Sequence, residues 1–326
     1  SAGGPMNSAI GLARLGVPVE FLGRLGDDAF AAQLRGHLAA NGVGTTLAVA
    51  AAQPTSLAVV SLDEVGKASY TFHFAGTANF GWRADELPEL GEGDWLHVAS
   101  LVTVVGPGHE AARRAIARHA LRLGSVIAPQ QLLVTNGCLE AIVLCLRAVT
   151  RPGDVVALES PTYFGFFEIL EQLHLRALEI PTHPRTGMAL DALQLAFETQ
   201  PVKAVLTVPT LSNPLGASMP LAERRRLARM AGVRGIPVIE DVIYNDLSEQ
   251  DDRRRSVHSF DEGGNVMLCG SFTKTLAPGI RLGWVAAGRW HAQVQRMKAS
   301  TSGGQSTVLE LAVAELLGQT GIESGY

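Results

Sequence analysis

Cysteine is scarce in this 326-residue sequence, and the three cysteines that it contains form no CxxC pair. That scarcity excludes a disulfide framework and a zinc site built on paired cysteines, and it favours a reducing compartment. Long apolar runs are also absent. The most apolar stretch, residues 95–105, is broken by polar residues and falls short of the ~18 to 20 residues that a membrane helix needs. We expect a cytoplasmic protein with no membrane span and no metal site.

The sequence also lacks the start of a secreted precursor. It opens with SAGGPMNSA and has no initiator methionine there. No basic segment followed by an apolar one comes after this opening, as a signal peptide would require. The sequence is therefore expected to be the interior of a longer protein.

A strong charge of either sign is missing as well. Lys and Arg together number 27 against 31 Asp and Glu, so the net charge is −4 and offers no bulk attraction to nucleic acid or anionic lipid. Two local arginine runs remain. Residues 224–226 lie on a predicted amphipathic helix, where we expect a solvated face, and residues 253–255 fall in a predicted loop. No nucleic-acid contact is expected from this chain itself.

What the sequence does contain is typical of an ordered globular protein of about two domains. Hydrophobic residues make up 47% and charged residues 18%, too apolar a balance for a disordered chain. In the first part, helical and strand-like segments are mixed, which predicts the α/β class. Two strand-like runs flank a glycine-containing turn and predict a β-hairpin. The expected helices include residues 9–15 and 34–38, and the expected strands are 17–26, 56–62, 69–74 and 95–104.

Three segments of this first part are similar to a known family. They are GGPMNSAIGLARLG (3–16), FLGRLGDDAFA (21–31) and the Pro54-Thr55-Ser56 lead into a strand. Together they resemble the amino-terminal part of the ribokinase-like (PfkB) sugar kinases, of the ketodeoxygluconate-kinase kind. The resemblance implies that Gly3, Gly4 and Asn7 lie against sugar hydroxyls. Without the family, the same residues are interpreted as a tight turn and a helix cap.

The catalytic half of such a kinase is not expected here. The family holds its base and its phosphate-binding amides in a Gly-x-Gly-Asp segment that opens a helix. The sequence has a Gly91-Glu92-Gly93-Asp94 segment, but it precedes the strand-like run 95–104 rather than a helix, so no helix N-terminus is available for phosphate. We therefore interpret residues 1–105 as a partial PfkB-like domain. The third function, after the two given below, is a carbohydrate-kinase fragment that is inactive.

From about residue 106 onward, apolar strand-like runs alternate with helical ones. Such alternation predicts a mostly parallel, doubly wound sheet with helices on both faces, in which ligands bind beyond the carboxyl ends of the strands. Polar residues follow five different strands of this predicted sheet, so the model brings them to one edge. These groups are Thr135-Asn136-Gly137, Pro161-Thr162-Tyr163, Ser212-Asn213-Pro214, Asp241 with Tyr244, and Ser271 with Lys274 and Arg281.

Together these groups resemble the fold-type I, class I and II aminotransferases, which use pyridoxal 5′-phosphate (PLP). The segment SFTKTLAPGIRLGW (271–284) is a specific match to the PLP-lysine segment. Within this superfamily, the sequence most resembles the aminotransferase-like domains of MocR/GntR-type regulators and the related aminoadipate and kynurenine transaminases. The resemblance covers residues 106–326 and identifies them as the large domain of this fold, joined to the kinase-like part near residues 105–109.

The resemblance also implies a role for each residue. Lys274 would form the Schiff base with the cofactor aldehyde and move the α-proton. Asp241 would keep the pyridine nitrogen protonated, since a buried carboxylate stabilises a neighbouring cation. Tyr244 and Asn213 would donate hydrogen bonds to the phenolic oxygen, and Tyr163 would stack on the ring.

A second set of residues is assigned to the cofactor phosphate. Ser271 and Arg281 would bind it, the arginine through charge-assisted bonds. The amides of Cys138 and Leu139, which follow Gly137 and open a helix, would add N-terminal donors. For Cys138 only the backbone is expected to act, because a buried cysteine usually behaves as a small apolar residue.

The chain is expected to transfer an amino group between an amino acid and a 2-oxo acid. Only 52 residues follow Lys274, whereas the family places its arginine for the substrate carboxylate in a small carboxy-terminal domain. We therefore expect that domain to be missing and activity to be impaired. The alternative is the PLP-binding, ligand-sensing domain of a MocR/GntR-type regulator. By resemblance, either parent is expected to be a homodimer.

Overall fold

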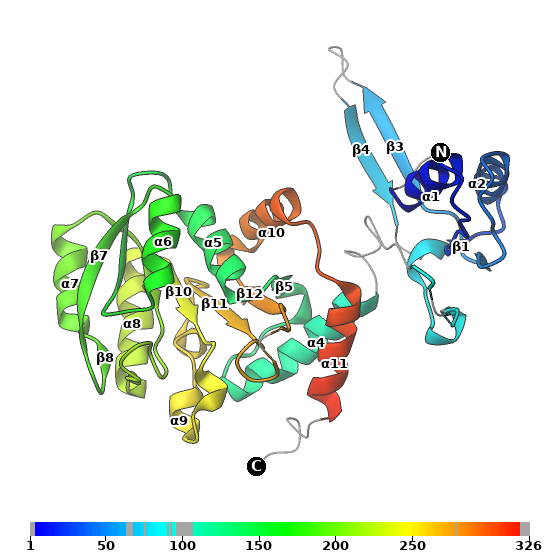
Figure 1. The fold of residues 1–326 in the computed structure, drawn as a ribbon. Coiled ribbons are helices and arrows are strands. Elements are labelled where there is room, and N and C mark those ends of the chain that lie inside the picture. Colours follow the sequence, from blue (N-terminus) through cyan, green and yellow to red (C-terminus); the bar gives the residue numbers. More distant parts are fainter. Residues whose placement is uncertain are drawn as a thin grey trace. The chain divides into compact units, whose positions relative to one another are not determined.

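The computed structural model describes residues 4–62, 68–74, 76–89, 91, 93–95, 107–277 and 279–319. The chain divides into two compact units, residues 1–107 and residues 108–326. Each unit is described by itself below (Figure 1). Among the described residues, no helix combines the length and the apolar character that crossing a membrane requires.

Unit 1 is a small α/β assembly with a core between two helices. The residues Met6, Ile10, Leu38 and Val43 are buried together and join α1 to α2. Asp28 begins α2: its carboxylate accepts a hydrogen bond from the Ala31 amide at 2.8 Å, as a helix cap does. The elements are α1 (Gly4–Arg14), β1 (Arg24–Leu25), α2 (Ala29–Ala40), β2 (Val49–Ala50), β3 (Leu57–Leu62), β4 (Ala68–His73) and two short 3₁₀ turns, Ala78–Phe80 and Ala84–Glu86.

Several expectations for unit 1 can be compared with these elements. The predicted hairpin is confirmed, since β3 and β4 pair antiparallel. Only Arg24–Leu25 of the strand expected over 17–26 is a strand. Asn7 lies exposed inside α1, which begins at Gly4, so the interpretation of Asn7 as a helix cap is wrong. Gly3 and most of the strand expected over 95–104 lie outside the described residues.

Unit 2 is built on an eight-stranded sheet with the order β5-β12-β11-β10-β9-β6-β7-β8. Neighbouring strands from β11 to β7 are parallel, whereas β12 and β8 run antiparallel to their neighbours. The mostly parallel sheet predicted from the sequence is therefore confirmed. The strands are β5 (Leu132–Thr135), β6 (Val155–Ser160), β7 (Arg176–His183), β8 (Gly187–Met188), β9 (Val202–Thr207), β10 (Val238–Asp241), β11 (Val266–Ser271) and β12 (Gly283–Ala286).

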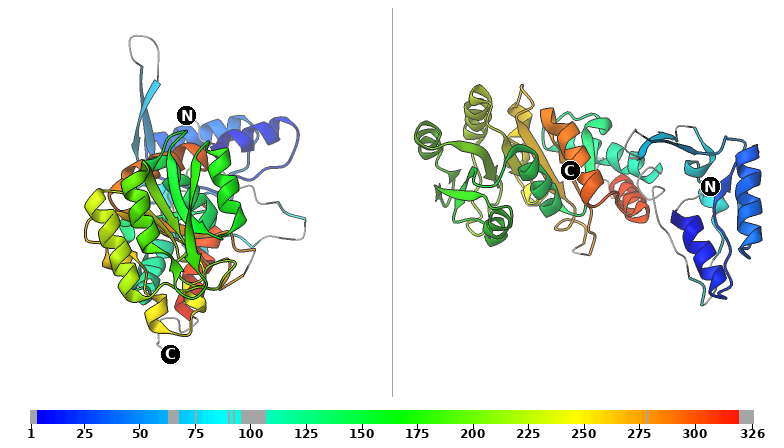
Figure 2. Two further views of the ribbon diagram at one scale, coloured as in Figure 1. Left: turned by 90° about the vertical axis from the view of Figure 1, so that its left-hand side faces the viewer. Right: turned by 90° about the horizontal axis from the view of Figure 1, so that it is seen from above.

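Helices cover both faces of this sheet (Figure 1; Figure 2). Alternating residues of one strand show the arrangement: Val156 and Leu158 pack against α5 and α6, whereas Val155 and Ala157 pack against α7 and α8. Near β5 and β12, α4 and α11 share a third cluster. The helices are α4 (Pro107–Arg122), α5 (Cys138–Val149), α6 (Phe164–Gln172), α7 (Leu190–Thr199), α8 (Leu221–Arg234), α9 (Asp251–Arg254), α10 (His291–Thr301) and α11 (Thr307–Gln319).

One part of the arginine run on α8 contradicts the expectation of a solvated face. The side chain of Arg224 is fully buried. Its guanidinium donates to three backbone carbonyls, those of Met219 (2.7 Å), Pro209 (3.0 Å) and Arg255. A planar guanidinium has enough donors for all three oxygens, which lie in two loops: Pro209 and Met219 in the loop between β9 and α8, and Arg255 in the loop after α9. Arg224 therefore ties these loops together inside unit 2.

Two glutamates lie buried in the sheet. Glu159 on β6 accepts hydrogen bonds from the Thr207 hydroxyl and the Val208 amide, and Glu240 on β10 accepts bonds from the amides of Val257 and His258. Burial raises the pKa of each carboxyl from 4.5 to about 7, because desolvation of the charged form outweighs these hydrogen bonds. The folded unit therefore favours the protonated form of both glutamates.

This preference predicts a fall in stability as the pH rises. A carboxyl whose pKa is raised on folding binds its proton more tightly in the folded state, so its contribution is complete below about pH 4.5 and is lost through about pH 7. The free energy of unfolding of unit 2 should fall by up to about 3 kcal/mol per such group between pH 5 and 8. Urea unfolding followed by the fluorescence of the buried Trp284 measures it.

The variant Glu159→Gln should make this pH dependence shallower, because it removes one of the titrating groups. Replacing the exposed Glu171 by Gln is the matched control and should leave the slope unchanged. An unaltered slope in the Glu159 variant would contradict the assignment.

Candidate functional site

A pocket of about 240 Å³ lies in unit 2 at the carboxyl ends of the central strands. It joins residues from the ends of β10 and β11, the start of α5 and the loops that follow β6, β9 and β11. Nine of the ten residues that the sequence predicted for a PLP site line it: Cys138, Leu139, Tyr163, Asn213, Asp241, Tyr244, Ser271, Lys274 and Arg281. The tenth, Gly137, lies beside the guanidinium of Arg281.

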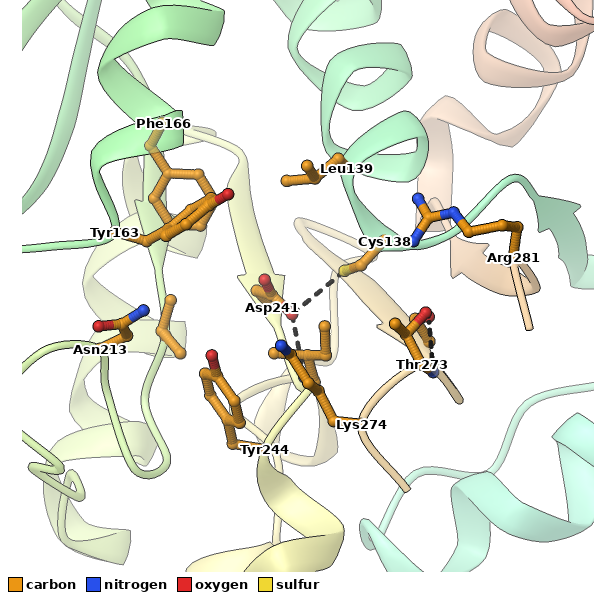
Figure 3. A pocket seen from close by; sticks show the side chains of 13 residues that line it. Cys138, Leu139, Tyr163, Phe166, Asn213, Asp241, Tyr244, Thr273, Lys274 and Arg281 are labelled. Carbon is orange, nitrogen blue, oxygen red and sulfur yellow. Dashed lines mark hydrogen bonds between the residues drawn. The ribbon is translucent and has the colours of Figure 1, made fainter. Parts of the chain in front are cut away.

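The topology explains this convergence. Asp241 is the last residue of β10 and Ser271 the last residue of β11, and the two strands are parallel neighbours. Their last residues therefore reach the same edge of the sheet. Tyr244 and Lys274 each follow three residues later, on loops at that edge. Figure 3 shows side chains from these separate elements facing one space.

The start of α5 is a close-packed corner. Gly137 has φ = +85°, a conformation that glycine adopts without strain. A Cβ atom at Gly137 would lie 2.7 Å from the Nη2 atom of Arg281, and a Cβ atom at Gly283 on β12 would lie 2.4 Å from the carbonyl carbon of Gly137. Both glycines are thus required for β12, Arg281 and the first turn of α5 to meet.

This corner has the properties of an anion site. The first amides of a helix have no partner within the helix, and the helix dipole favours a negative charge near them. Arg281 adds a guanidinium, which donates to the carbonyl of Asn136 at 3.2 Å. Glu140, in the same turn, faces a buried cation: its carboxylate lies 3.4 Å from Nζ of Lys298. The same carboxylate accepts a hydrogen bond from the Asn136 amide, so the negative charge of Glu140 is paired within the protein.

Asp241 is the buried carboxylate of the pocket, with 4% of its surface exposed. Its Oδ1 atom accepts hydrogen bonds from the thiol of Cys138 at 3.1 Å and from the amide of Ile243 at 2.9 Å. Burial raises the pKa of Asp241 from 3.8 to about 6, while both hydrogen bonds oppose that rise. Burial and the neighbouring Asp241 also raise the pKa of the Tyr244 hydroxyl.

The loop after β11 brings hydroxyls and an amine to the same space. The Ser271 and Thr273 hydroxyls lie 2.7 Å apart, and the Thr273 hydroxyl also contacts the carbonyl of Ile280 at 3.2 Å. These contacts turn the chain so that Lys274 lines the pocket that Asp241 also lines (Figure 3). The Lys274 side chain is exposed, so its amine is accessible from solvent.

Four lining residues were not predicted from the sequence: Phe166, Val208, Ile243 and Thr273. The ring of Tyr163 packs edge-on against Phe166, with 5.5 Å between ring centroids. This apolar wall suits a flat aromatic ligand. Thr273 could have been found, since it stands between Ser271 and Lys274 in the quoted motif. Nothing in the sequence around the three apolar residues indicated that they would line a pocket.

The donor set of the pocket fits the chemical groups of PLP. The α5 amides and Arg281 match the phosphate, the buried carboxylate matches the pyridine nitrogen, and the Lys274 amine matches the aldehyde. Tyr163 and its apolar neighbours match the ring. No cluster of metal ligands occurs among the residues that the structure describes.

Two family models match the chain. The model "Aminotransferase class I and II" matches residues 101–324, and the model "pfkB family carbohydrate kinase" matches residues 1–137. Both resemblances stated from the sequence are therefore confirmed. The two matches overlap over 101–137, a range that contains the end of unit 1.

Individual relatives divide into regulators and enzymes. The uncharacterized HTH-type transcriptional regulator YjiR of Escherichia coli is 41% identical over 219 residues, which is 66% of this chain and 47% of the regulator. Aromatic-amino-acid aminotransferase 1 of Thermococcus litoralis is 33% identical over 49% of this chain and 40% of the enzyme. The chain thus spans about half the length of the curated relatives that it matches.

Solved structures place the fold among the aminotransferases. An archaeal alanine:glyoxylate aminotransferase matches 66% of this chain and 54% of its own, with a TM-score of 0.61 and 27% identity. LysN, an α-aminoadipate aminotransferase from Thermus thermophilus, matches 65% of this chain and 54% of its own, with a TM-score of 0.59 and 27% identity.

The corner between α5 and β12 generates a prediction for Gly137→Ala. The added methyl group strains the backbone at φ = +85° and collides with Arg281. Because an arginine–phosphate bond is charge-assisted, its loss should weaken binding of PLP about tenfold or more. Titration of the protein with PLP, followed by absorbance, gives the dissociation constant.

A matched control separates strain from contact. Gly153 has a similar φ of +90° with nothing within 4 Å of an added Cβ, so Gly153→Ala carries the strain alone. Equal PLP affinity in the two variants would contradict the role of the corner.

Proposed function

Because the chain belongs, over residues 101–324, to the class I and II aminotransferase family, we propose that it transfers an amino group between an amino acid and a 2-oxo acid. Enzymes of this family depend on PLP. The observation that carries the proposal is the convergence of Lys274, Asp241 and Arg281 on one pocket. These residues supply the amine, the buried carboxylate and the guanidinium that the chemistry needs.

When bound, PLP supplies an aldehyde that condenses with amines and a ring that withdraws electrons from the substrate Cα. In the proposed mechanism the Lys274 amine holds the cofactor at rest. When a substrate amine takes its place, the freed Lys274 amine would take the proton from the substrate Cα and deliver it to the former aldehyde carbon of the cofactor, which keeps the amino group. A single lysine thus serves as anchor and as base.

The other residues bind and orient. Asp241 would keep the ring nitrogen protonated. The residue is 4% exposed, so the ion pair between the carboxylate and the protonated nitrogen would be shielded from water and therefore stronger. Tyr244 and Asn213 would donate to the phenolic oxygen. Arg281, the Ser271 hydroxyl and the first α5 amides would hold the phosphate, and Tyr163 would keep water from one face of the ring.

A second candidate is a PLP-binding, ligand-sensing domain. The observation that favours it is the identity of 41% and 35% with two proteins named as HTH-type transcriptional regulators, of each of which this chain covers 47%. A sensing domain needs the same cofactor pocket but no turnover. Rapid conversion of an amino acid would favour the enzyme, and slow conversion with ligand binding would favour the sensor.

The wider setting of the proposal follows the family. The partners are amino acids and 2-oxo acids, and the assembly is a homodimer. A cytoplasmic location is consistent with the three cysteines, which are free thiols and buried. Gly3, Gly4 and Asn7 stay assigned to a vestigial sugar site without kinase activity.

We expect borohydride reduction of the PLP-loaded protein to fix the cofactor on Lys274. The sequence has four lysines, and among those that the structure describes Lys274 is the one that lines the pocket. Peptide mapping by mass spectrometry identifies the labelled residue. Lys298 is an internal control, because its amine is buried and bonded to Gln305 and Ser302. A label found mainly on Lys203 or Lys298 would contradict the site.

We also expect the chain to bind PLP far better than it transaminates. Among the described lining residues Arg281 is the single arginine, and the proposal assigns it to the phosphate. The substrate carboxylate then lacks a guanidinium, and lost orientation of this sort costs on the order of a hundredfold in rate. A single-turnover reaction with a panel of amino acids, followed by absorbance, measures it.

The reference for this measurement is an intact aminotransferase of the family under the same conditions. An equally fast conversion would show that another group in this chain orients the substrate carboxylate. Arg289 and Arg296 are then the residues to replace first.

A further inference from the structure

The two hydrogen-bond donors to Asp241 reach the same oxygen atom. Both the Cys138 thiol and the Ile243 amide donate to Oδ1, at 3.1 and 2.9 Å. Figure 3 shows the bond from Cys138 as a dashed line, on the side of the carboxylate that faces α5. The Ile243 amide belongs to the loop that follows β10. The second oxygen, Oδ2, is left for whatever occupies the pocket.

The position of the thiol is fixed by the fold. Cys138 is the first residue of α5 and is 97% buried, and its backbone is held by the corner that Gly137 and Gly283 form. Burial and the neighbouring Asp241 raise the pKa of the Cys138 thiol well above its usual range. The thiol therefore keeps its proton and acts as a donor to Asp241.

We infer that Cys138 is a positioning residue for the cofactor, whose S–H group holds the Asp241 carboxylate in its charged form with Oδ2 directed at the pyridine nitrogen of PLP. The inference rests on the proposed function. It extends the role expected from the sequence, in which only the Cys138 backbone acted.

The physical basis of this inference is an equilibrium in which one proton is bound either to the ring nitrogen or to a carboxylate oxygen. The proton between Asp241 and the ring can lie on nitrogen, giving a carboxylate and a pyridinium, or on oxygen, giving a neutral pair. A donor to Oδ1 stabilises the carboxylate and therefore moves the proton to nitrogen. A charged Asp241 in turn raises the pKa of the buried Glu159 and Glu240, because a second carboxylate nearby disfavours their charged forms.

The ring nitrogen itself reports this distribution. We propose to load the protein with PLP labelled with ¹⁵N in the ring and to record its NMR resonance, which differs between the protonated and neutral ring. In Cys138→Ala the resonance should move toward the neutral form, by an amount that corresponds to an about three- to tenfold change in the proton equilibrium. Cys138→Ser should restore the wild-type position, since a hydroxyl also donates.

Cys145→Ala is the matched control. Cys145 is a buried thiol on the same helix, but its sulfur lies 3.8 Å from the sulfur of Cys269 and has no bond to Asp241. This variant should leave the resonance unchanged. A purely structural role of Cys138 would lower the unfolding midpoint of Cys138→Ala without moving the resonance, and that result would overturn the inference.

A measurement without cofactor tests the hydrogen bond directly. The infrared S–H stretching band of Cys138, obtained as the difference between wild type and Cys138→Ala, should lie at lower frequency than the bands of the other two thiols. Asp241→Asn should raise that frequency, because a neutral acceptor binds the S–H group more weakly. A Cys138 S–H stretching frequency that is the same in wild type and in Asp241→Asn would overturn the inference.

The two measurements also separate this inference from the proposed function. If the wild type binds PLP at Lys274 but its ¹⁵N resonance matches that of Cys138→Ala, the inference is wrong and the proposed function stands. If no PLP binds, both are wrong, whatever the infrared band shows.

Discussion

The close contact between Gly137 and Gly283 is the constraint on which the pocket of unit 2 depends. Because neither residue has a side chain, the first turn of α5 can lie against β12. That approach places unpaired helix amides beside Arg281 and the Cys138 thiol beside Asp241. One packing contact between a helix and a strand thus sets both the phosphate end and the nitrogen end of the proposed cofactor site.

Much of this arrangement could be predicted from the sequence, because parallel strands end at a common edge. Asp241, Ser271 and Tyr163 each follow an apolar run, so the strand-end rule places them together without knowledge of packing. The strand β12 was not predicted, since its four residues, Gly283–Ala286, are too few to show a period. Such a short strand is specified by its neighbours on both sides.

Side-chain contacts at a distance were the other part that the sequence did not predict. Arg224 was expected on a solvated face because its neighbours are arginines, yet it is fully buried. Its three acceptors lie five to 31 residues away along the chain. The Cys138–Asp241 bond joins residues 103 apart. The local spacing of apolar residues does not show which distant residues will be in contact. The resemblance to a known family does predict the result of these contacts, namely which residues line the pocket.

The buried guanidinium of Arg224 also limits how the loop after β9 can move. Two of its acceptors, the carbonyls of Pro209 and Met219, stand at the two ends of the loop that contains Asn213. Both ends are therefore fastened to the same rigid group on α8, and an arginine keeps its charge at any pH that the protein meets. Motion of Asn213 is confined to the tip between these two anchors. The loop can therefore adjust to a ligand only by moving its tip, because Arg224 keeps the distance between its two ends constant.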